Sequence, residues 1–396
     1  MKTSRRKLLG GSTAMLVAGI SGCIGDDEGD LLGDGENGED VEDQATPAPE
    51  ETPRITQLHD PSEYHCPDRP AGEDIDGGPP LSETPLPIPA CPDELDDDRV
   101  SGGPGQDGIP SIENPEFESV SDADNRFDDG DPVFGIYRDG EAKVYSQNIL
   151  VWHEIVNDEI AGDPVAVTYC PLTGTAQGFE RGDVEFGVSG QLLNSNLVMF
   201  DRDTETYWPQ ILATGINGPL TGETLQEFPV TWTTWGRWKE AFPDSQVLTE
   251  DTGYIRNYRN DPYGSYNTRS GFYSNEDLIF SPFVSEDEGL LHPKAVVIGA
   301  RSEHGSLAAH KELLREERIL EAIVGEVPHL VVYDDTLDTG YIYENPQEYE
   351  VTQQETGYEV DGSTYGPDSL PMDRVLRYDA MWFAWFGYYP STKLIH

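Results

Sequence analysis

The chain repeats one pattern of residues, and this repetition limits the folds that it can adopt. The segment DPVFGIYRDGEAKVYSQNIL, which begins at Asp131, is matched by HPKAVVIGARSEHGSLAAHKEL, which begins at His292. Farther along, IAGDPVAVTY ends at Tyr169 and its counterpart IVGEVPHLVVY ends at Tyr333. Short alternating strands with one short helical stretch are therefore expected twice.

Large aromatic residues close each copy at the same spacing. They are Trp235, Trp238 and Pro243 in the first copy, and Trp382, Trp385 and Pro390 in the second. We expect the tryptophans to anchor one shared core. The predicted fold is mainly β (α+β), an internally duplicated, pseudo-symmetric domain with short helices over residues 120–396. The first repeat spans about 124–250 and the second about 285–396.

Four motifs of this body resemble a known family. They are WHEIVND, TYCPL, SGQLLNSNLVMFDRDTETYW and WFAWFGYYPST. From about Asp124 to His396 the chain is similar to the uncharacterised family catalogued as domain of unknown function 3179, many of whose members are exported proteins of bacteria and archaea. The resemblance implies no particular activity. Family members often have CPLC where this chain has Thr173 in place of the second cysteine, which disfavours a dithiol redox mechanism and affects a one-thiol metal site less.

The first residues have the pattern of an export signal. Ser4, Arg5 and Arg6 begin a twin-arginine motif, and a short apolar run leads to a lipobox that ends at Cys23. Residues 1–22 are thus interpreted as a lipoprotein signal peptide, with lipidated Cys23 anchoring the mature protein to the membrane. The alternative is an uncleaved membrane anchor. Both interpretations place the body at the extracytoplasmic face of the cell membrane.

Acidic residues dominate the chain. There are 75 acidic and 25 basic residues, for a formal charge of −50, and residues 26–51 contain twelve acidic residues and no basic one. Residues 23–53 are therefore expected to form a disordered tether. Molar salt would screen the self-repulsion, so the acidity indicates adaptation to high salt. No basic stripe of a nucleic-acid-binding protein is present, and calcium binding, the alternative, lacks a twelve-residue oxygen-ligand loop.

Residues 54–119 are rich in Pro and Gly and show little periodicity. Outside the cell, a disulfide between Cys66 and Cys91 would close a loop of about 25 residues and stabilise the fold by about 3 kcal/mol. Two free thiols are the first alternative. A metal site with His65 is the second, and it lacks another pair of ligands nearby.

Cys170 ends a core-like strand, VAVTYC, in the first copy, where the second copy has Asp334. Its simplest role is that of a small apolar core residue. With His153 and Met199 it would offer the ligand set of copper, with zinc as the other candidate metal. With His153 oriented by Asn157 or Asp158, it would instead be a nucleophile. The second copy keeps the strand pattern and lacks these reactive residues, so the site is expected in the first half.

A polar run near Cys170 is the candidate wall of a small-ligand pocket, with an aromatic side. Its members are Ser189, Asn194, Ser195, Asp201 and Trp208. The alternative is a hairpin whose turns use the same residue types. The chain contains no GxSxG, HExxH, P-loop or dinucleotide fingerprint. The sequence thus predicts a lipid-anchored surface protein that binds a small ligand or metal, with a cysteine-dependent enzyme or a structural surface protein as alternatives.

Overall fold

The computed structural model describes residues 53–282 and 289–396. Within these ranges the chain folds mainly into short β-strands, with six α-helices of four to seven residues, so the expected mainly-β fold is confirmed. The export signal, Cys23 and the acidic tether up to residue 52 lie outside the described residues. No helix in the described ranges is long and apolar enough to span a membrane.

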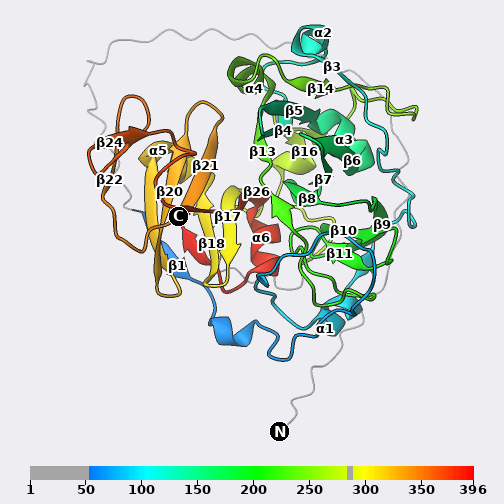
Figure 1. Cartoon of the computed structure of the whole chain (residues 1–396), viewed down its shortest axis with the longest axis horizontal. Helices are drawn as coiled ribbons and strands as arrows, with labels where there is room; N and C mark the ends of the chain where they lie inside the picture. Colours follow the sequence, from blue (N-terminus) through cyan, green and yellow to red (C-terminus); the bar gives the residue numbers. More distant parts are fainter. Residues whose placement is uncertain (1–52, 283–288) are drawn as a thin grey trace, which may run out of the picture. The chain divides into compact units, whose positions relative to one another are not determined.

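Five strands form one sheet built around a hairpin of the first half (Figure 1). The hairpin turns at Asp139 and Gly140, which both have positive φ (49° and 89°), as in a type I′ turn. In order across the sheet, the strands are β13 (Thr231–Thr234), β4 (Pro132–Arg138), β5 (Glu141–Ser146), β14 (Gln246–Leu248) and β3 (Phe117–Ser119). β14 is parallel to β5, and the other neighbours are antiparallel.

A second five-stranded sheet has the same arrangement in the second half. In order, its strands are β26 (Arg377–Met381), β17 (Val296–Ser302), β18 (Gly305–His310), β27 (Lys393–Ile395) and β1 (Ile55–Gln57). Here β27 is the strand that runs parallel to its neighbour, β18. The edge strand β1 comes from the Pro/Gly-rich segment, which is thereby joined to the body.

Each half adds a four-stranded sheet, which the chain enters through a seven-residue helix, α3 (Gln147–His153) or α5 (Lys311–Glu317). A residue with positive φ follows each helix, Glu154 (59°) or Arg318 (68°). The strands are β6 (Ile155–Ile160), β7 (Asp163–Cys170), β8 (Thr175–Glu180) and β12 (Glu227–Phe228) in the first half, and β19 (Ile319–Val324), β20 (Val327–Asp334), β21 (Thr339–Glu344) and β25 (Asp373–Val375) in the second. The matched order is what a duplicated unit would produce, and the duplication itself stays a prediction.

The two halves differ in what surrounds these sheets. The motif SGQLLNSNLVMFDRDTETYW forms β9 (Phe186–Leu193), β10 (Asn196–Asp201) and β11 (Tyr207–Pro209), which β2 (Val100–Ser101) joins. The second half has instead β22 (Val351–Gln353), β23 (Tyr358–Val360) and β24 (Ser363–Tyr365). The remaining helices and strands are α1 (Pro92–Asp97), α2 (Val120–Ala123), α4 (Trp235–Ala241), α6 (Trp382–Tyr388), β15 (Gly264–Ser265) and β16 (Ser270–Gly271).

One tryptophan in each half packs directly on a glycine of the five-stranded sheet. Trp238 from α4 lies against Gly135 in β4, and Trp385 from α6 lies against Gly299 in β17. A Cβ atom added to Gly135 or Gly299 would lie 2.0 or 2.2 Å from a ring carbon, so only glycine fits. Each indole N–H donates to a hydroxyl seven residues later, at 3.0 Å.

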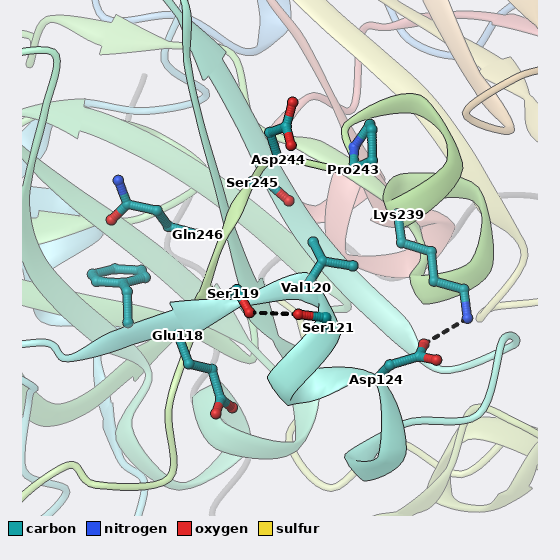
Figure 2. A pocket seen from close by; sticks show the side chains of 11 residues that line it. Glu118, Ser119, Val120, Ser121, Asp124, Lys239, Pro243, Asp244, Ser245 and Gln246 are labelled. Carbon is teal, nitrogen blue, oxygen red and sulfur yellow. Dashed lines mark hydrogen bonds and ion pairs between the residues drawn. The ribbon is translucent and has the colours of Figure 1, made fainter.

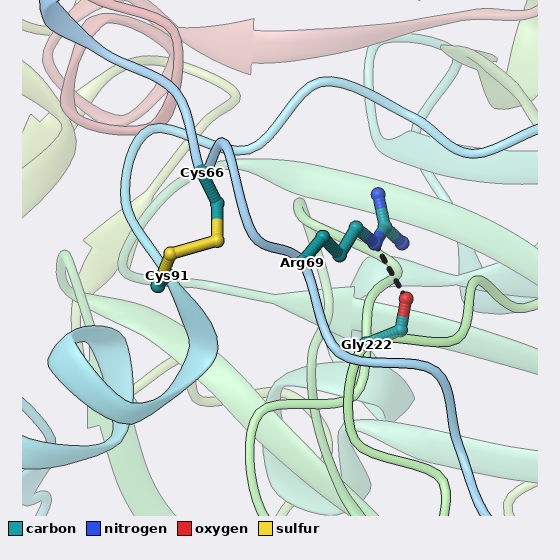
Figure 3. The surroundings of a disulfide bond; sticks show 4 residues. All are labelled: Cys66, Arg69, Cys91 and Gly222. Carbon is teal, nitrogen blue, oxygen red and sulfur yellow. Dashed lines mark hydrogen bonds between the residues drawn. A yellow bond between two sulfur atoms is a disulfide. The ribbon is translucent and has the colours of Figure 1, made fainter.

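A disulfide and an arginine hold the Pro/Gly-rich segment in place (Figure 3). Cys66 and Cys91 are joined, with a sequence separation of 25 residues. Arg69 donates to the carbonyl of Gly222 at 2.6 Å and to Oγ1 of Thr224 at the same distance. The segment thus has few regular elements of its own. The disulfide closes a loop within it, and Arg69 and strand β1 connect it to the body.

Replacing either glycine beneath a tryptophan by alanine should destabilise the protein. We expect Gly135→Ala and Gly299→Ala each to lower the free energy of unfolding by about 3 kcal/mol, because the added methyl group overlaps the indole ring. Denaturant unfolding in molar salt measures this. Gly105→Ala is the matched control, because a Cβ there meets nothing within 4 Å, and its change should stay within about 0.5 kcal/mol. Equal stability of all three variants would contradict the anchoring role.

Candidate functional site

His153 is buried at the end of α3, and both of its ring nitrogens have partners. Nδ1 lies 2.8 Å from the carbonyl oxygen of Pro110, and Nε2 lies 2.7 Å from the hydroxyl of Tyr258. Burial lowers the pKa of His153, so the imidazole is neutral at pH 7. A neutral ring with both nitrogens engaged supports the local fold and has no free atom for a metal or for Cys170.

Cys170 ends β7 with 1% of its surface exposed. Its Sγ lies 3.8 Å from the carbonyl oxygen of Ser195, and its side chain packs in an apolar cluster that also contains Met199. Burial, followed by the nearby carboxylate of Glu154, raises the pKa of the thiol to about 11. The structure thus brings Cys170 and Met199 into one apolar cluster, whereas both ring nitrogens of His153 contact Pro110 and Tyr258. Among the described residues, no three His, Cys, Asp or Glu side chains are placed to hold a metal ion.

The other predicted site residues use their polar atoms in the local fold. Asp201 accepts hydrogen bonds from Thr204 and from Nε1 of Trp208, the latter at 2.9 Å. Ser189 donates to a carbonyl of the neighbouring strand β10. The other three are bound as well: Asn194 donates to Gly387, Ser195 to Phe280, and Asn157 to Phe186 and Glu113. These contacts are those of tightly turned hairpins and of packing between segments.

A charged pocket of about 440 Å³ lies where the two five-stranded sheets and α5 meet. β13 of the first half and β26 of the second contribute to its lining, as do Tyr266 and Arg269 from the linker between the halves (residues 261–273). The residues that give this charged pocket its character are Trp232, Thr233, Tyr266, Arg269, Lys311, Glu312, Arg315, Asp338 and Asp379. Three of them are cationic and three are anionic.

The Lys311 ammonium is short of hydrogen-bond partners. Three lysines in the described part of the chain are buried. Lys143 donates to both oxygens of Asp158 and to the carbonyl of Glu159, and Lys294 likewise has three acceptors. Lys311 has a single partner among the described residues, Oδ2 of Asp379 at 2.7 Å. Since an ammonium has three donors, two donors of Lys311 remain for the pocket.

Asp379, the partner of Lys311, also has too few hydrogen bonds within the described part of the chain, in its case as an acceptor. It is 3% exposed, and its Oδ1 has no hydrogen-bond partner in the described residues. Oγ1 of Thr233 and the Tyr266 hydroxyl, which also belong to the pocket, are buried without a partner of ordinary geometry. Buried polar atoms without partners cost about 1–3 kcal/mol each, and native proteins contain few of them.

A second ion pair stands beside the first. Nε and an Nη atom of Arg315 donate to the two carboxylate oxygens of Asp338 at 2.7 and 2.6 Å. Burial raises the pKa of Asp338, but the hydrogen bonds from Arg315 and the charge of Lys311 outweigh burial and hold it below its ordinary value. The carboxylate is therefore ionised at neutral pH and close enough to Lys311 to feel its charge.

Aromatic rings supply the apolar side of the charged pocket. Trp232 and Tyr266 meet edge to face, with centroids 5.4 Å apart. Arg269 is exposed and lies 5.8 Å from the ring of Tyr266, without a carboxylate partner among the described residues. The pocket thus combines aromatic faces with charged donors and acceptors, which is typical of binding sites for small polar molecules.

The equivalent position of the first half is filled by the linker between the halves (residues 261–273). Gln147 begins α3 as Lys311 begins α5. Its amide donates to Oδ2 of Asp261 at 2.7 Å and lies 3.4 Å from the hydroxyl of Tyr273, which donates to the same oxygen at 2.8 Å. The Tyr273 ring stacks on Tyr266 with centroids 4.0 Å apart. The position next to Gln147 is thus filled by side chains of the linker, whereas the matching position next to Lys311 is the charged pocket.

A larger hollow of about 790 Å³ lies at the surface near β3 and β14 (Figure 2). Lys239 is its cation, and it pairs with Asp124 at 2.7 Å. Figure 2 shows this pair at one side, with Glu118 and Gln246 elsewhere on the wall. Lys239 pairs with Asp124 and Asp129 and is partly exposed, and no described residue of this lining has a buried polar atom without a partner, unlike the charged pocket.

Reasoning from sequence missed Lys311, Arg315, Asp338 and Asp379. The site predicted from sequence consisted of Cys170, His153 and residues expected near them, all in the first half. A usable signal was present, because basic residues are few in this chain and two of them, Lys311 and Arg315, stand one helical turn apart in the second copy.

The Cys170 thiol should be unreactive in the folded protein. With a pKa of about 11, roughly one molecule in 10⁴ carries a thiolate at pH 7, and the sulfur is buried. We expect no alkylation by iodoacetamide over hours in the native state and complete alkylation in guanidinium, measured by mass spectrometry of the peptide that carries Cys170. Rapid modification of the native protein would revive the nucleophile hypothesis.

Glu154 should make the protein less stable as the pH rises. Burial raises the pKa of this carboxyl from 4.5 to about 8, so the folded state binds a proton that the unfolded state releases between these values. The free energy of unfolding should therefore fall by about 3 kcal/mol between pH 5 and pH 8 relative to Glu154→Gln, which cannot titrate. Denaturant unfolding of both proteins at the two pH values tests this, and parallel pH profiles would contradict it.

Comparison with known proteins gives one match. The model of the family described as "Protein of unknown function (DUF3179)" matches residues 106–392, more than half of the chain, and includes Cys170 and every residue of the charged pocket. No curated protein and no solved structure gives a significant match. The chain therefore belongs to the DUF3179 family.

Proposed function

We propose that this protein is a binding module for a small polar ligand, held at the extracytoplasmic face of the cell membrane by a lipid on Cys23. The charged pocket is its binding site. The observation that carries the proposal is the buried Lys311–Asp379 ion pair, whose two residues line a cavity of about 440 Å³ and have too few hydrogen-bond partners among the described residues. The location rests on the twin-arginine motif and lipobox, and the Cys66–Cys91 disulfide fits an oxidising compartment.

The energetics support a binding role for this pair. A buried ion pair is stabilising only when further hydrogen bonds satisfy both partners, as they do for Lys143 with Asp158, Glu159 and Tyr145. Lys311 and Asp379 lack such bonds in the described residues. A bound molecule with its own polar groups would supply the missing hydrogen bonds of Lys311 and Asp379. Forming these bonds would favour binding.

The same reasoning gives less support to the other hypotheses. A copper or zinc site at Cys170, His153 and Met199 would need a thiolate, whereas burial raises the thiol pKa, and it would need a free imidazole nitrogen. A cysteine-dependent enzyme with Asn157 as orienting residue meets the same two obstacles. A purely structural surface protein would have no use for the unsatisfied pair in the charged pocket.

Binding can be tested without knowing the ligand. The mature protein, in molar salt, is dialysed to equilibrium against a library of small polar metabolites, and retained compounds are identified by mass spectrometry. Wild type should retain at least one compound, and the double variant Lys311→Met with Asp379→Asn should lower its affinity at least about tenfold, or about 1.4 kcal/mol. Because this variant removes both charges and leaves no unpaired ion, it should be as stable as wild type or more so.

Two controls make the outcome decisive. Lys239→Met removes the cation of the surface hollow in Figure 2 and should leave retention unchanged. Arg269→Gln changes an exposed side chain in the lining of the charged pocket, where no loss of stability is expected, and should weaken retention. The proposal would be rejected if folded wild type retains nothing, or if Lys239→Met alone abolishes retention.

A further inference from the structure

We infer that the charged pocket binds a small, uncharged polyhydroxylated compound, a sugar or sugar alcohol. The inference rests on the proposed function and specifies the chemical class of the ligand. It is drawn from four features of the pocket: its balance of charges, the pairing of its donors and acceptors, its aromatic wall and its counterpart in the first half.

The charge balance argues against an ionic ligand. The pocket has three cations, Arg269, Lys311 and Arg315, and three anions, Glu312, Asp338 and Asp379. A site for a phosphate or a carboxylate needs uncompensated positive charge, and a site for an amine needs the reverse.

The pairing of donors with acceptors suits a hydroxyl. Lys311 Nζ donates to Asp379 Oδ2 at 2.7 Å and has further donors, and the other oxygen of the same carboxylate, Oδ1, has no partner among the described residues. A hydroxyl accepts one hydrogen bond and donates another, so it can satisfy both at once. The carboxylate of an amino acid or another zwitterion, if it approached Lys311, would come next to Asp379 and near Asp338, where like charges repel.

The aromatic wall suits a sugar ring. Trp232 and Tyr266 are the aromatic residues of the lining, which also includes the apolar Pro132 and Val296. Most of the other lining side chains are charged or hydroxylated. The C–H face of a pyranose is apolar and its edge carries hydroxyls, so it can pack on an aromatic ring while its edge meets ion pairs. The volume of about 440 Å³ lies within the range for small-molecule sites.

The first half displays the same interaction within the chain. There the Tyr273 hydroxyl donates to Oδ2 of Asp261 at 2.8 Å and faces the Gln147 amide at 3.4 Å. Gln147 has the position in α3 that Lys311 has in α5. In the first half, the hydroxyl of Tyr273 thus lies between the amide nitrogen of Gln147 and the carboxylate of Asp261. We assign the equivalent role in the charged pocket to a hydroxyl of the ligand.

Calorimetric titration of the full mature protein in molar salt tests the class. The neutral probes are glucose, galactose, mannose, trehalose, sucrose and glycerol, and the charged probes are glucuronate, galacturonate, glucosamine and glutamate. At least one neutral probe should bind, and each of the four charged probes should bind at least about tenfold more weakly than that compound. The Lys311→Met, Asp379→Asn double variant should abolish this binding, whereas Lys239→Met should not change it.

The outcomes separate this inference from the proposed function. If the metabolite library yields a ligand that depends on Lys311 and Asp379 but is anionic, cationic or zwitterionic, the sugar class is wrong and the binding function stands. The same holds if glucuronate or glucosamine binds as tightly as its neutral parent. If the folded protein retains no compound from the library and none of the neutral probes, both are wrong.

Discussion

The contact between a tryptophan and a glycine is the constraint on which each half of the structure depends. Because Gly299 has no side chain, Trp385 can approach the backbone of β17, and this holds α6 against the sheet. β26 leads directly into α6 and pairs with β17 in a fixed register that places Asp379 opposite Ile298, the residue before Gly299. β18, on the other side of β17, leads into Lys311. The packing contact therefore determines where both members of the ion pair lie.

A pocket that is held by such rigid packing can retain buried charged groups that lower the stability of the fold. The buried pairs of this protein differ in how completely their atoms are bonded. Lys143 and Asp158 have all their principal partners, whereas Lys311 and Asp379 stop at one hydrogen bond. The tightly packed sheet around Gly299 supplies the rigidity that keeps two incompletely bonded ions in position, which is how binding sites are held ready for a ligand.

Much of the fold was predictable from sequence because its signals are local or repeated. Alternation of apolar residues in two similar segments indicated a mainly-β body, and the structure joins Cys66 to Cys91 as expected. The pocket was not predictable in the same way, because Lys311 and Asp379 are 68 residues apart and meet only through strand register. Cys170 and His153 were predicted as site residues from their residue types. In the structure, burial raises the pKa of the thiol, and both ring nitrogens of His153 have hydrogen-bond partners.

The two halves differ in what they contribute to the charged pocket. In the second half, residues 334–338 replace residues 170–174, and from this difference we expected the functional site in the first half. However, Asp338, which corresponds to Gly174, lines the charged pocket. The linker explains why the halves diverged. Through Tyr273 and Asp261 it fills the first position, and through Tyr266 and Arg269 it forms a wall of the second. Since Tyr266 and Tyr273 stack on each other, the segment that closes one position also shapes the other, so the two halves cannot vary independently at this place.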